Sequence, residues 1–217
     1  MIPARDPNKA LWYVHLLKTG GQSIRRVFQW WYPNNRVTFA SGTDGTVVHD
    51  HFERPSGLSV EDIHQELAFD PKDVQMVTCL REPFFQIQSL YHYWRTANPE
   101  QSLNVFGDWT ALPNIAKDFE EFIGACPYNN RQYLPEGADA KEILDQFALV
   151  GVYEGLDDWC HVLAQWLGFG MPAAIPRINV TLLYEWQIEL RKLYREMHPE
   201  EYELYDEALR RWKEIRP

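Results

Sequence analysis

Three mostly apolar runs, at positions 11–17, 74–80 and 148–152, stand out from the mixture of apolar and polar residues along the chain. Runs of this length are typical of strands that are buried on both faces of a sheet. The apolar residues after the first run recur at helical spacing: Ile24, Val27, Phe28 and Trp31. Strands that alternate with amphipathic helices predict an α/β fold with a mostly parallel central sheet, flanked by helices on both faces.

Weaker patterns occupy the intervals between these runs. Short strands are expected at 37–39 and 46–48, and a helix at about 60–69. Another amphipathic helix follows the third run, with this apolar stripe: Trp159, Val162, Leu163, Trp166 and Leu167. These patterns place further strands and helices around the same sheet.

The second half of the chain contains one irregular region and a helical end. Positions 98–135 contain several prolines and a short expected helix around 119–122. Long connections of this kind often shape the substrate side of an α/β enzyme, and we assign this region to the substrate side of a pocket. The C-terminal part shows two amphipathic stretches that break near His198 and Pro199. Because the sequence shows no linker or internal repeat, we expect a single domain over residues 1–217.

The segment 18–23, Lys-Thr-Gly-Gly-Gln-Ser, joins the first expected strand to the first expected helix. Its two glycines allow a sharp turn and a close approach to a ligand, and the helix N-terminus presents unpaired N–H groups. Lys18 adds a cation to this cradle. The ATP and GTP loop has its lysine after the glycines, so this pattern predicts an anion site of another kind.

A second candidate phosphate site follows the second apolar run. Arg81 comes directly after that run, Pro83 suits the first turn of a helix, and Ser89 lies about two turns further along. The fork of an arginine matches the geometry of phosphate oxygens. We therefore expect Arg81 and Ser89 to hold a second phosphate.

Together these two segments resemble those of the sulfotransferases that use 3′-phosphoadenosine 5′-phosphosulfate, in particular the carbohydrate 2-O- and 6-O-sulfotransferase branch. In that family a Pro-Lys-Thr-Gly-Gly-Thr-Ser loop holds the 5′-phosphosulfate, and Arg-Asp-Pro with a helix serine holds the 3′-phosphate. This chain departs from the pattern at Leu17, Gln22 and Glu82. The resemblance extends through 149–154, 177–181 and 202–205, and it implies a P-loop-like three-layer fold.

The resemblance also assigns roles to residues. Lys18 would stabilise the leaving phosphate, and a histidine would take the proton of the acceptor hydroxyl. His49 lies three residues before Phe52, as in the family, and His51 completes an H-x-H pattern of the 2-O branch; Asp50 or Glu53 could orient the histidine or act instead. The acceptor side would include Arg131 and Gln132. The cofactor side would include Lys18, Thr19, Gly20, Gly21, Gln22, Ser23, Arg81, Ser89 and Arg177.

Composition narrows the choice of partner and compartment. The resemblance implies a hydroxyl-bearing small molecule or a carbohydrate as the acceptor, and the formal charge of −10 disfavours nucleic-acid binding and a long polyanionic acceptor. The three cysteines show no C-x-x-C spacing, the His-x-His pair lacks a convincing third ligand, and no metal is expected. Without a recognisable signal peptide or membrane segment, the expected location is cytoplasmic, and the alternative is a Golgi-type enzyme trimmed of its membrane stem.

Two other functions compete with sulfuryl transfer. A nucleotide-dependent kinase of related fold would need magnesium ligands and a loop for the β- and γ-phosphates, and the sequence shows neither. A non-catalytic module that kept the nucleotide cleft would bind the ligand without transferring a group.

Overall fold

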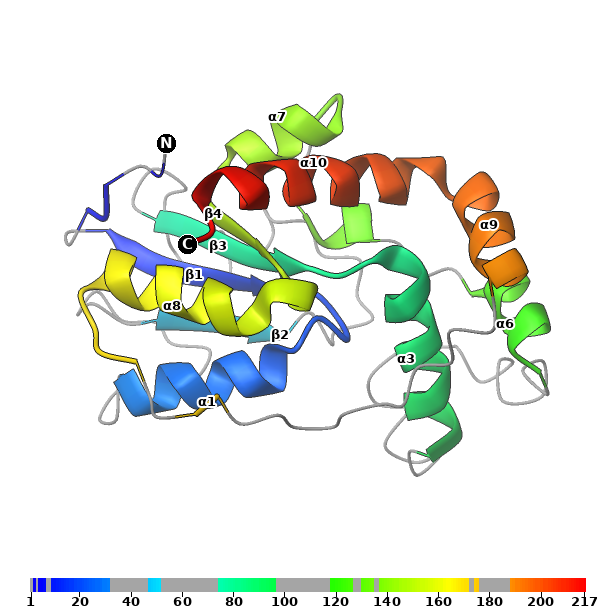
Figure 1. The fold of residues 1–217 in the computed structure, drawn as a ribbon, viewed down its shortest axis with the longest axis horizontal. Coiled ribbons are helices and arrows are strands. Elements are labelled where there is room, and N and C mark those ends of the chain that lie inside the picture. The colour runs from blue at the N-terminus through cyan, green and yellow to red at the C-terminus, as the bar shows by residue number, and fades with distance from the viewer. Residues whose placement is uncertain are drawn as a thin grey trace.

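The fold is seen in a computed structural model, which describes residues 2, 4–6, 9–31, 47–51, 74–96, 118–126, 130–134, 137–171, 174–175 and 188–217 (Figure 1). Four strands form one sheet: β1 (Ala10–His15), β2 (Val47–His51), β3 (Val74–Leu80) and β4 (Phe147–Val152). Their order is β2-β1-β3-β4, and all neighbouring pairs are parallel. The predicted parallel sheet is confirmed.

Helices flank this sheet. Figure 1 shows α7 (Ala140–Asp145) and α10 (Pro199–Ile215) above the sheet, α8 (Leu156–Leu167) in front of its strands and α1 (Gly21–Trp31) below it. The α/β class with helices on both sides is therefore confirmed. Among the described residues, no helix combines the length and the apolarity that crossing a membrane requires.

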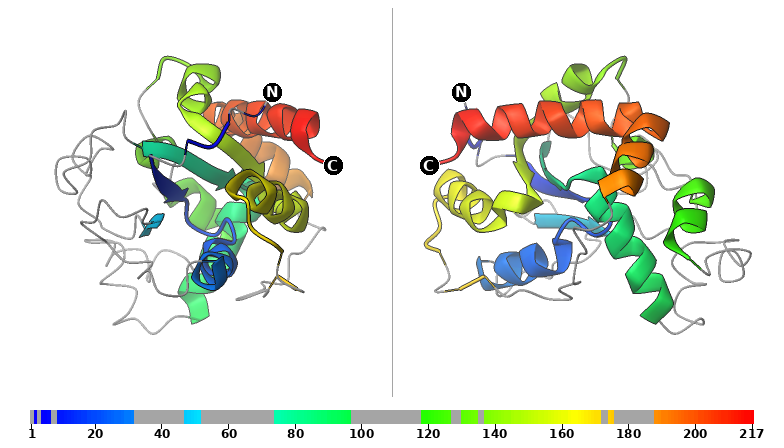
Figure 2. Two further views of the ribbon diagram at one scale, coloured as in Figure 1. Left: turned by 90° about the vertical axis from the view of Figure 1, so that its left-hand side faces the viewer. Right: turned by 45° about the vertical axis from the view of Figure 1, so that its right-hand side comes forward.

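Further helical elements in the described residues lie beyond the carboxyl ends of the strands or in the connections. These are α3 (Pro83–Thr96), η3 (Asn130–Tyr133), α6 (Phe119–Ala125), η4 (Tyr153–Gly155) and α9 (Ile188–Met197). Figure 2 shows α3, α6 and α9 grouped at one end of the sheet. The expected short helix at 119–122 is found as α6, and the C-terminal helices break at His198 as predicted. The elements expected at 37–39 and 60–69 fall outside the described residues.

Two hydrophobic clusters result from this arrangement. The larger one joins the sheet to α1, α8 and α10, and Trp159 of α8 packs directly on Gly151 of β4. A Cβ atom at Gly151 would lie 1.8 Å from the Trp159 ring, so only glycine permits this contact. The smaller cluster joins α3, α6, α9 and the start of α10 through aromatic residues. The carboxyl edge of the sheet lies where the two clusters meet.

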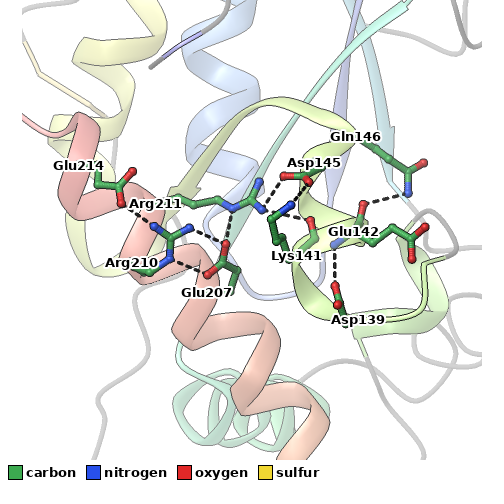
Figure 3. A network of polar contacts seen from close by, with 9 residues as sticks. All are labelled: Asp139, Lys141, Glu142, Asp145, Gln146, Glu207, Arg210, Arg211 and Glu214. Carbon is green, nitrogen blue, oxygen red and sulfur yellow. Dashed lines mark hydrogen bonds and ion pairs between the residues drawn. The ribbon is translucent and has the colours of Figure 1, made fainter.

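Ion pairs tie α10 to α7 on the upper face of the sheet (Figure 3). Arg211 of α10 donates to Asp145 of α7 at 2.8 Å and to Glu207 of its own helix at 2.8 Å. Arg210 also donates to Glu207, and the two arginines lower the pKa of this carboxyl group to about 2. This network lies at the opposite edge of the sheet from the loop at 18–20, so a substitution in it leaves the loop untouched.

Candidate functional site

The loop between β1 and α1 has a distinctive backbone. Lys18 has a φ of 61°, and Gly20 has a φ of 84°. Left-handed backbone is unusual for a residue with a Cβ atom, and it is often found at functional sites. The amides of Ser23 and Ile24 donate to the Gly20 carbonyl at 2.9 and 3.1 Å, and so start α1. β1 ends at His15, two residues before the predicted end at Leu17, because the chain already turns there.

Both glycines of the loop are required by close contacts. A Cβ atom at Gly20 would lie 2.9 Å from the ring of Tyr153, and one at Gly21 would lie 1.6 Å from Nε2 of His15. Thr19 is completely buried, and its hydroxyl donates to the Leu16 carbonyl at 2.8 Å. The loop is therefore packed from below by β1 and from the side by η4, while the first turn of α1 begins directly after it.

Arg81 links the tip of β3 to this loop. Its side chain is only 5% exposed, and Nη1 donates to the Lys18 carbonyl at 2.9 Å. The guanidinium also stacks over Tyr153, 4.3 Å from the ring centroid. Burial lowers the pKa of Arg81, whereas Tyr153, Glu154 and Glu82 oppose this shift, so the guanidinium keeps its charge at neutral pH. The two predicted phosphate sites are thus direct neighbours.

One face of α3 turns toward the loop. Gln86 donates from Nε2 to the Leu17 carbonyl at 2.6 Å, and Nζ of Lys18 lies 4.3 Å from the ring centroid of Tyr93. Residues three and four apart lie on the same face of a helix, so Ser89 lies between these two contacts. Ser89 is buried, in agreement with that position. The structure therefore brings Lys18, Arg81 and Ser89 together at one edge of the sheet.

Glu82 connects the start of α3 to the C-terminal helices. Its Oε2 accepts from the amide of Phe85 at 2.9 Å and caps α3. Its Oε1 accepts from Arg191 at 3.0 Å and from the Tyr202 hydroxyl at 2.8 Å. Burial and the nearby Glu82 carboxylate raise the pKa of Tyr202, so the phenol remains a donor. Glu82 thereby holds α9 and α10 against the start of α3.

A second carboxylate has a similar position at the tip of β4. Glu154 accepts from the amide of Glu82 at 3.0 Å and from the Tyr205 hydroxyl at 3.1 Å. No sequence pattern had predicted Glu154, Arg191 or the two tyrosines at this edge. The spacing of Tyr202 and Tyr205, three residues apart on an amphipathic helix, is the signal that places both on its buried face.

The two candidate base histidines belong to β2. In the register of β1 and β2, His49 pairs with Tyr13 and His51 pairs with His15, the last residue of β1 before the loop. The expected strand at 46–48 thus continues to His51. The strand that carries both histidines lies next to the strand that carries the loop, and the two end at the same edge.

The other predicted residues have different positions. Gln22 and Ser23 lie in the first turn of α1, with Ser23 buried. Arg131 and Gln132 lie in η3, where Arg131 donates to the Gly137 carbonyl at 3.3 Å. Arg177 lies outside the described residues.

Thiol chemistry has little support among the described residues. Cys79, Cys126 and Cys160 are free and buried, and burial raises the pKa of Cys160 to about 12 and that of Cys79 well above its ordinary value. Such thiols stay protonated and are poor nucleophiles. Within the parts of the chain that the structure describes, no group of three or more His, Cys, Asp or Glu side chains is arranged to hold a metal ion.

Comparison with known proteins adds no assignment. No protein-family model matches the chain, and no curated protein shows significant sequence similarity to it. The function is therefore inferred from the geometry of the loop, of Arg81 and of α3.

Proposed function

We propose that this protein is a sulfotransferase with a P-loop-like three-layer fold, which transfers a sulfuryl group from 3′-phosphoadenosine 5′-phosphosulfate to a hydroxyl of a carbohydrate or small molecule. The observation that carries this proposal is the hydrogen bond from Arg81 to the Lys18 carbonyl. It joins the two segments that resemble the 5′-phosphosulfate and 3′-phosphate sites of that family. A single adenosine nucleotide with phosphates on its 3′ and 5′ oxygens would bridge these two segments.

The loop supplies the features that a 5′-phosphosulfate needs. The N-terminus of α1 follows Gly20 directly, and it favours negative charge through its N–H groups and its dipole. The Lys18 ammonium, stacked on Tyr93, lies beside the same loop. Lys18 and the helix N-terminus would together neutralise the charge that develops on the leaving phosphate.

Arg81 and Ser89 would bind the 3′-phosphate. Arg81 is buried, charged and oriented by two contacts. Its side chain would therefore lose little conformational entropy when it binds a ligand. Among the described residues, its Nε has no hydrogen-bond partner, and a buried unpaired donor of this kind favours an anionic ligand. Ser89, on the face of α3 that contacts the loop, adds a hydroxyl from the other side.

The proposed reaction needs one base and an aligned acceptor. The acceptor oxygen forms a bond to sulfur while the bond from sulfur to the 5′-phosphate oxygen breaks, and the acceptor proton passes to His49 or His51. Adenosine 3′,5′-bisphosphate is released, and no metal is required in this scheme. Arg131 and Gln132 in η3 are the proposed acceptor contacts, and Arg177 is a further proposed cofactor contact.

Calorimetric titration with adenosine 3′,5′-bisphosphate tests the proposal. We expect binding to the wild type and a loss of roughly 10- to 100-fold in affinity for Arg81→Ala, since a hydrogen bond between charged groups contributes about 1.5–3 kcal/mol. Arg210→Ala is the matched control, because it removes an arginine at the opposite edge of the sheet. Equal affinities for the two variants would contradict the proposal.

Two further assays separate the competing functions. We expect His49→Ala or His51→Ala to bind the nucleotide but to transfer sulfuryl groups slowly, whereas a non-catalytic module would show no transfer in the wild type either. Magnesium-dependent hydrolysis of ATP, without affinity for adenosine 3′,5′-bisphosphate, would instead indicate a kinase.

A further inference from the structure

A buried chain of side-chain hydrogen bonds runs from the loop to α10. Nε2 of Gln86 donates to the Leu17 carbonyl at 2.6 Å and to Oδ1 of Asn130 at 2.9 Å. In return, Nδ2 of Asn130 donates to Oε1 of Gln86 at 2.8 Å and to Oε2 of Glu201 at 2.8 Å. We call this set, Gln86, Asn130 and Glu201, the amide relay. It connects α3, η3 and α10 to the residue that precedes Lys18.

The amide hydrogens of the relay are all used, whereas Oε1 of Glu201 has no hydrogen-bond partner among the described residues. Each of its two amide nitrogens has two hydrogens, and all four are used by the bonds above. The two ends, a backbone carbonyl and a carboxylate, both accept hydrogen bonds. The orientation of both amides is therefore fixed, because turning either one would place oxygen against oxygen.

Burial makes this arrangement costly to disturb. Gln86, Asn130 and Glu201 are 2%, 1% and 3% exposed, so water does not easily replace a lost partner. A substitution at one member would leave groups of the next member unpaired. The effect of a change at Glu201 can thus reach the loop through Asn130 and Gln86.

We propose that the amide relay is a positioning device, which holds the Leu17 carbonyl so that Lys18 keeps its left-handed backbone and the loop keeps its ligand-binding shape. Gln86, Asn130 and Glu201 are positioning residues, since they act through the backbone of the loop. Because Asn130 also starts η3, the relay couples the segment of Arg131 and Gln132 to the loop. Its relevance to nucleotide affinity depends on the proposed function.

The geometry of the loop supports this assignment. Two consecutive carbonyls are held from different elements: that of Leu17 by Gln86 of α3, and that of Lys18 by Arg81 at the tip of β3. The backbone between these two carbonyls belongs to Lys18, which has a φ of 61°. Surrounding contacts must maintain this left-handed conformation. The relay provides one of these two anchors.

Amide hydrogen exchange tests the proposal without any ligand. The amides of Ser23 and Ile24 report on the loop, since both donate to the Gly20 carbonyl, and the amide of Phe169, which donates to Ala164, is a remote reference. In Asn130→Asp at pH 8, we expect protection of Ser23 and Ile24 to fall about tenfold more than that of Phe169. Lower pH should restore part of it, because the protonated carboxyl group regains one donor hydrogen.

Two further variants keep this test decisive. Gln86→Met removes the amide that contacts the loop without adding charge, so it should lower the same protection at every pH and remain measurable if Asn130→Asp does not fold. Ile143→Ala, in the core contact of α7, is the control for general destabilisation. If protection of Ser23, Ile24 and Phe169 falls equally in Gln86→Met, as it should in Ile143→Ala, the relay does not position the loop.

Nucleotide affinity separates this proposal from the proposed function. We expect Gln86→Met to weaken binding of adenosine 3′,5′-bisphosphate about tenfold and Ile143→Ala to leave it unchanged. If the wild type does not bind the nucleotide, the proposed function fails, whereas the exchange experiment still decides on the relay. If the wild type binds and Gln86→Met binds equally well, the relay is not a positioning device for this ligand.

Discussion

The buried carboxyl group of Glu201 predicts a specific dependence of stability on pH. Burial raises its pKa from 4.5 to about 7, although Asn130 and Arg131 oppose the rise. Below pH 4.5 the carboxyl group carries its proton in both the folded and the unfolded state, and it imposes no penalty. As the pH rises from 4.5 to 7, the unfolded state loses this proton first, so the folded state becomes relatively less stable.

The size of this penalty follows from the two pKa values. At about 1.4 kcal/mol for each pKa unit, the difference between 4.5 and about 7 corresponds to about 3 kcal/mol of unfolding free energy at pH 8. Glu201→Gln removes the titration and keeps an oxygen that accepts from Asn130. Among the neighbouring titratable groups, Tyr194 keeps its proton over this range because its pKa is raised by burial.

Guanidinium denaturation of the wild type and Glu201→Gln at pH 4 and pH 8 measures the effect. The difference between their unfolding free energies cancels the contributions of other groups, and we expect it to shift by about 3 kcal/mol in favour of the variant at pH 8. If the difference between the two unfolding free energies is the same at pH 4 and pH 8, Glu201 does not titrate as a buried group and the predicted penalty does not exist.

Three further substitutions test the packing of the site. Lys18→Gly should be about 1 kcal/mol more stable than Lys18→Ala in chemical denaturation, because glycine adopts the left-handed backbone freely; equal stabilities would show that the loop is not strained. Gly21→Ala should destabilise the protein by about 3 kcal/mol because the added Cβ atom overlaps His15, and the loss should be clearly smaller in a His15→Ala background. Equal losses of stability in thermal melts of the two backgrounds would argue against that contact. Glu82→Ala should lower the free energy of unfolding by about 2–3 kcal/mol, because α3 loses its cap and the Tyr202 hydroxyl loses its partner. In a Tyr202→Phe background the loss should be smaller. Strictly additive losses in a double-mutant cycle would contradict the pairing of Glu82 with Tyr202.

The sequence was informative where burial alone decides the structure. The strands β1, β3 and β4 are buried on both faces of a parallel sheet, so their apolar runs marked them directly. The sequence also predicted that the loop and Arg81 lie close together, because the carboxyl ends of parallel strands meet at one edge of the sheet. Strand ends were less predictable: β1 stops at His15 because the turn to Lys18 depends on contacts with Tyr153 and Arg81 that no local pattern reveals.

The amide relay illustrates what the sequence could not provide. Gln86 and Asn130 are 44 residues apart, and Asn130 and Glu201 are 71 apart. A glutamine in a helix and a glutamate in the first turn of another helix are ordinary surface residues by pattern, and only the tertiary structure shows that both are buried. The same holds for Glu82, whose capping role was open to prediction but whose contacts with Arg191 and Tyr202 were not.

The most direct test of the central claim is a crystal structure with bound adenosine 3′,5′-bisphosphate. We expect one molecule, with its 5′-phosphate against the Lys18–Gly20 loop and its 3′-phosphate against Arg81 and Ser89. A nucleotide bound away from these residues, or two molecules that occupy the loop and Arg81 separately, would contradict it.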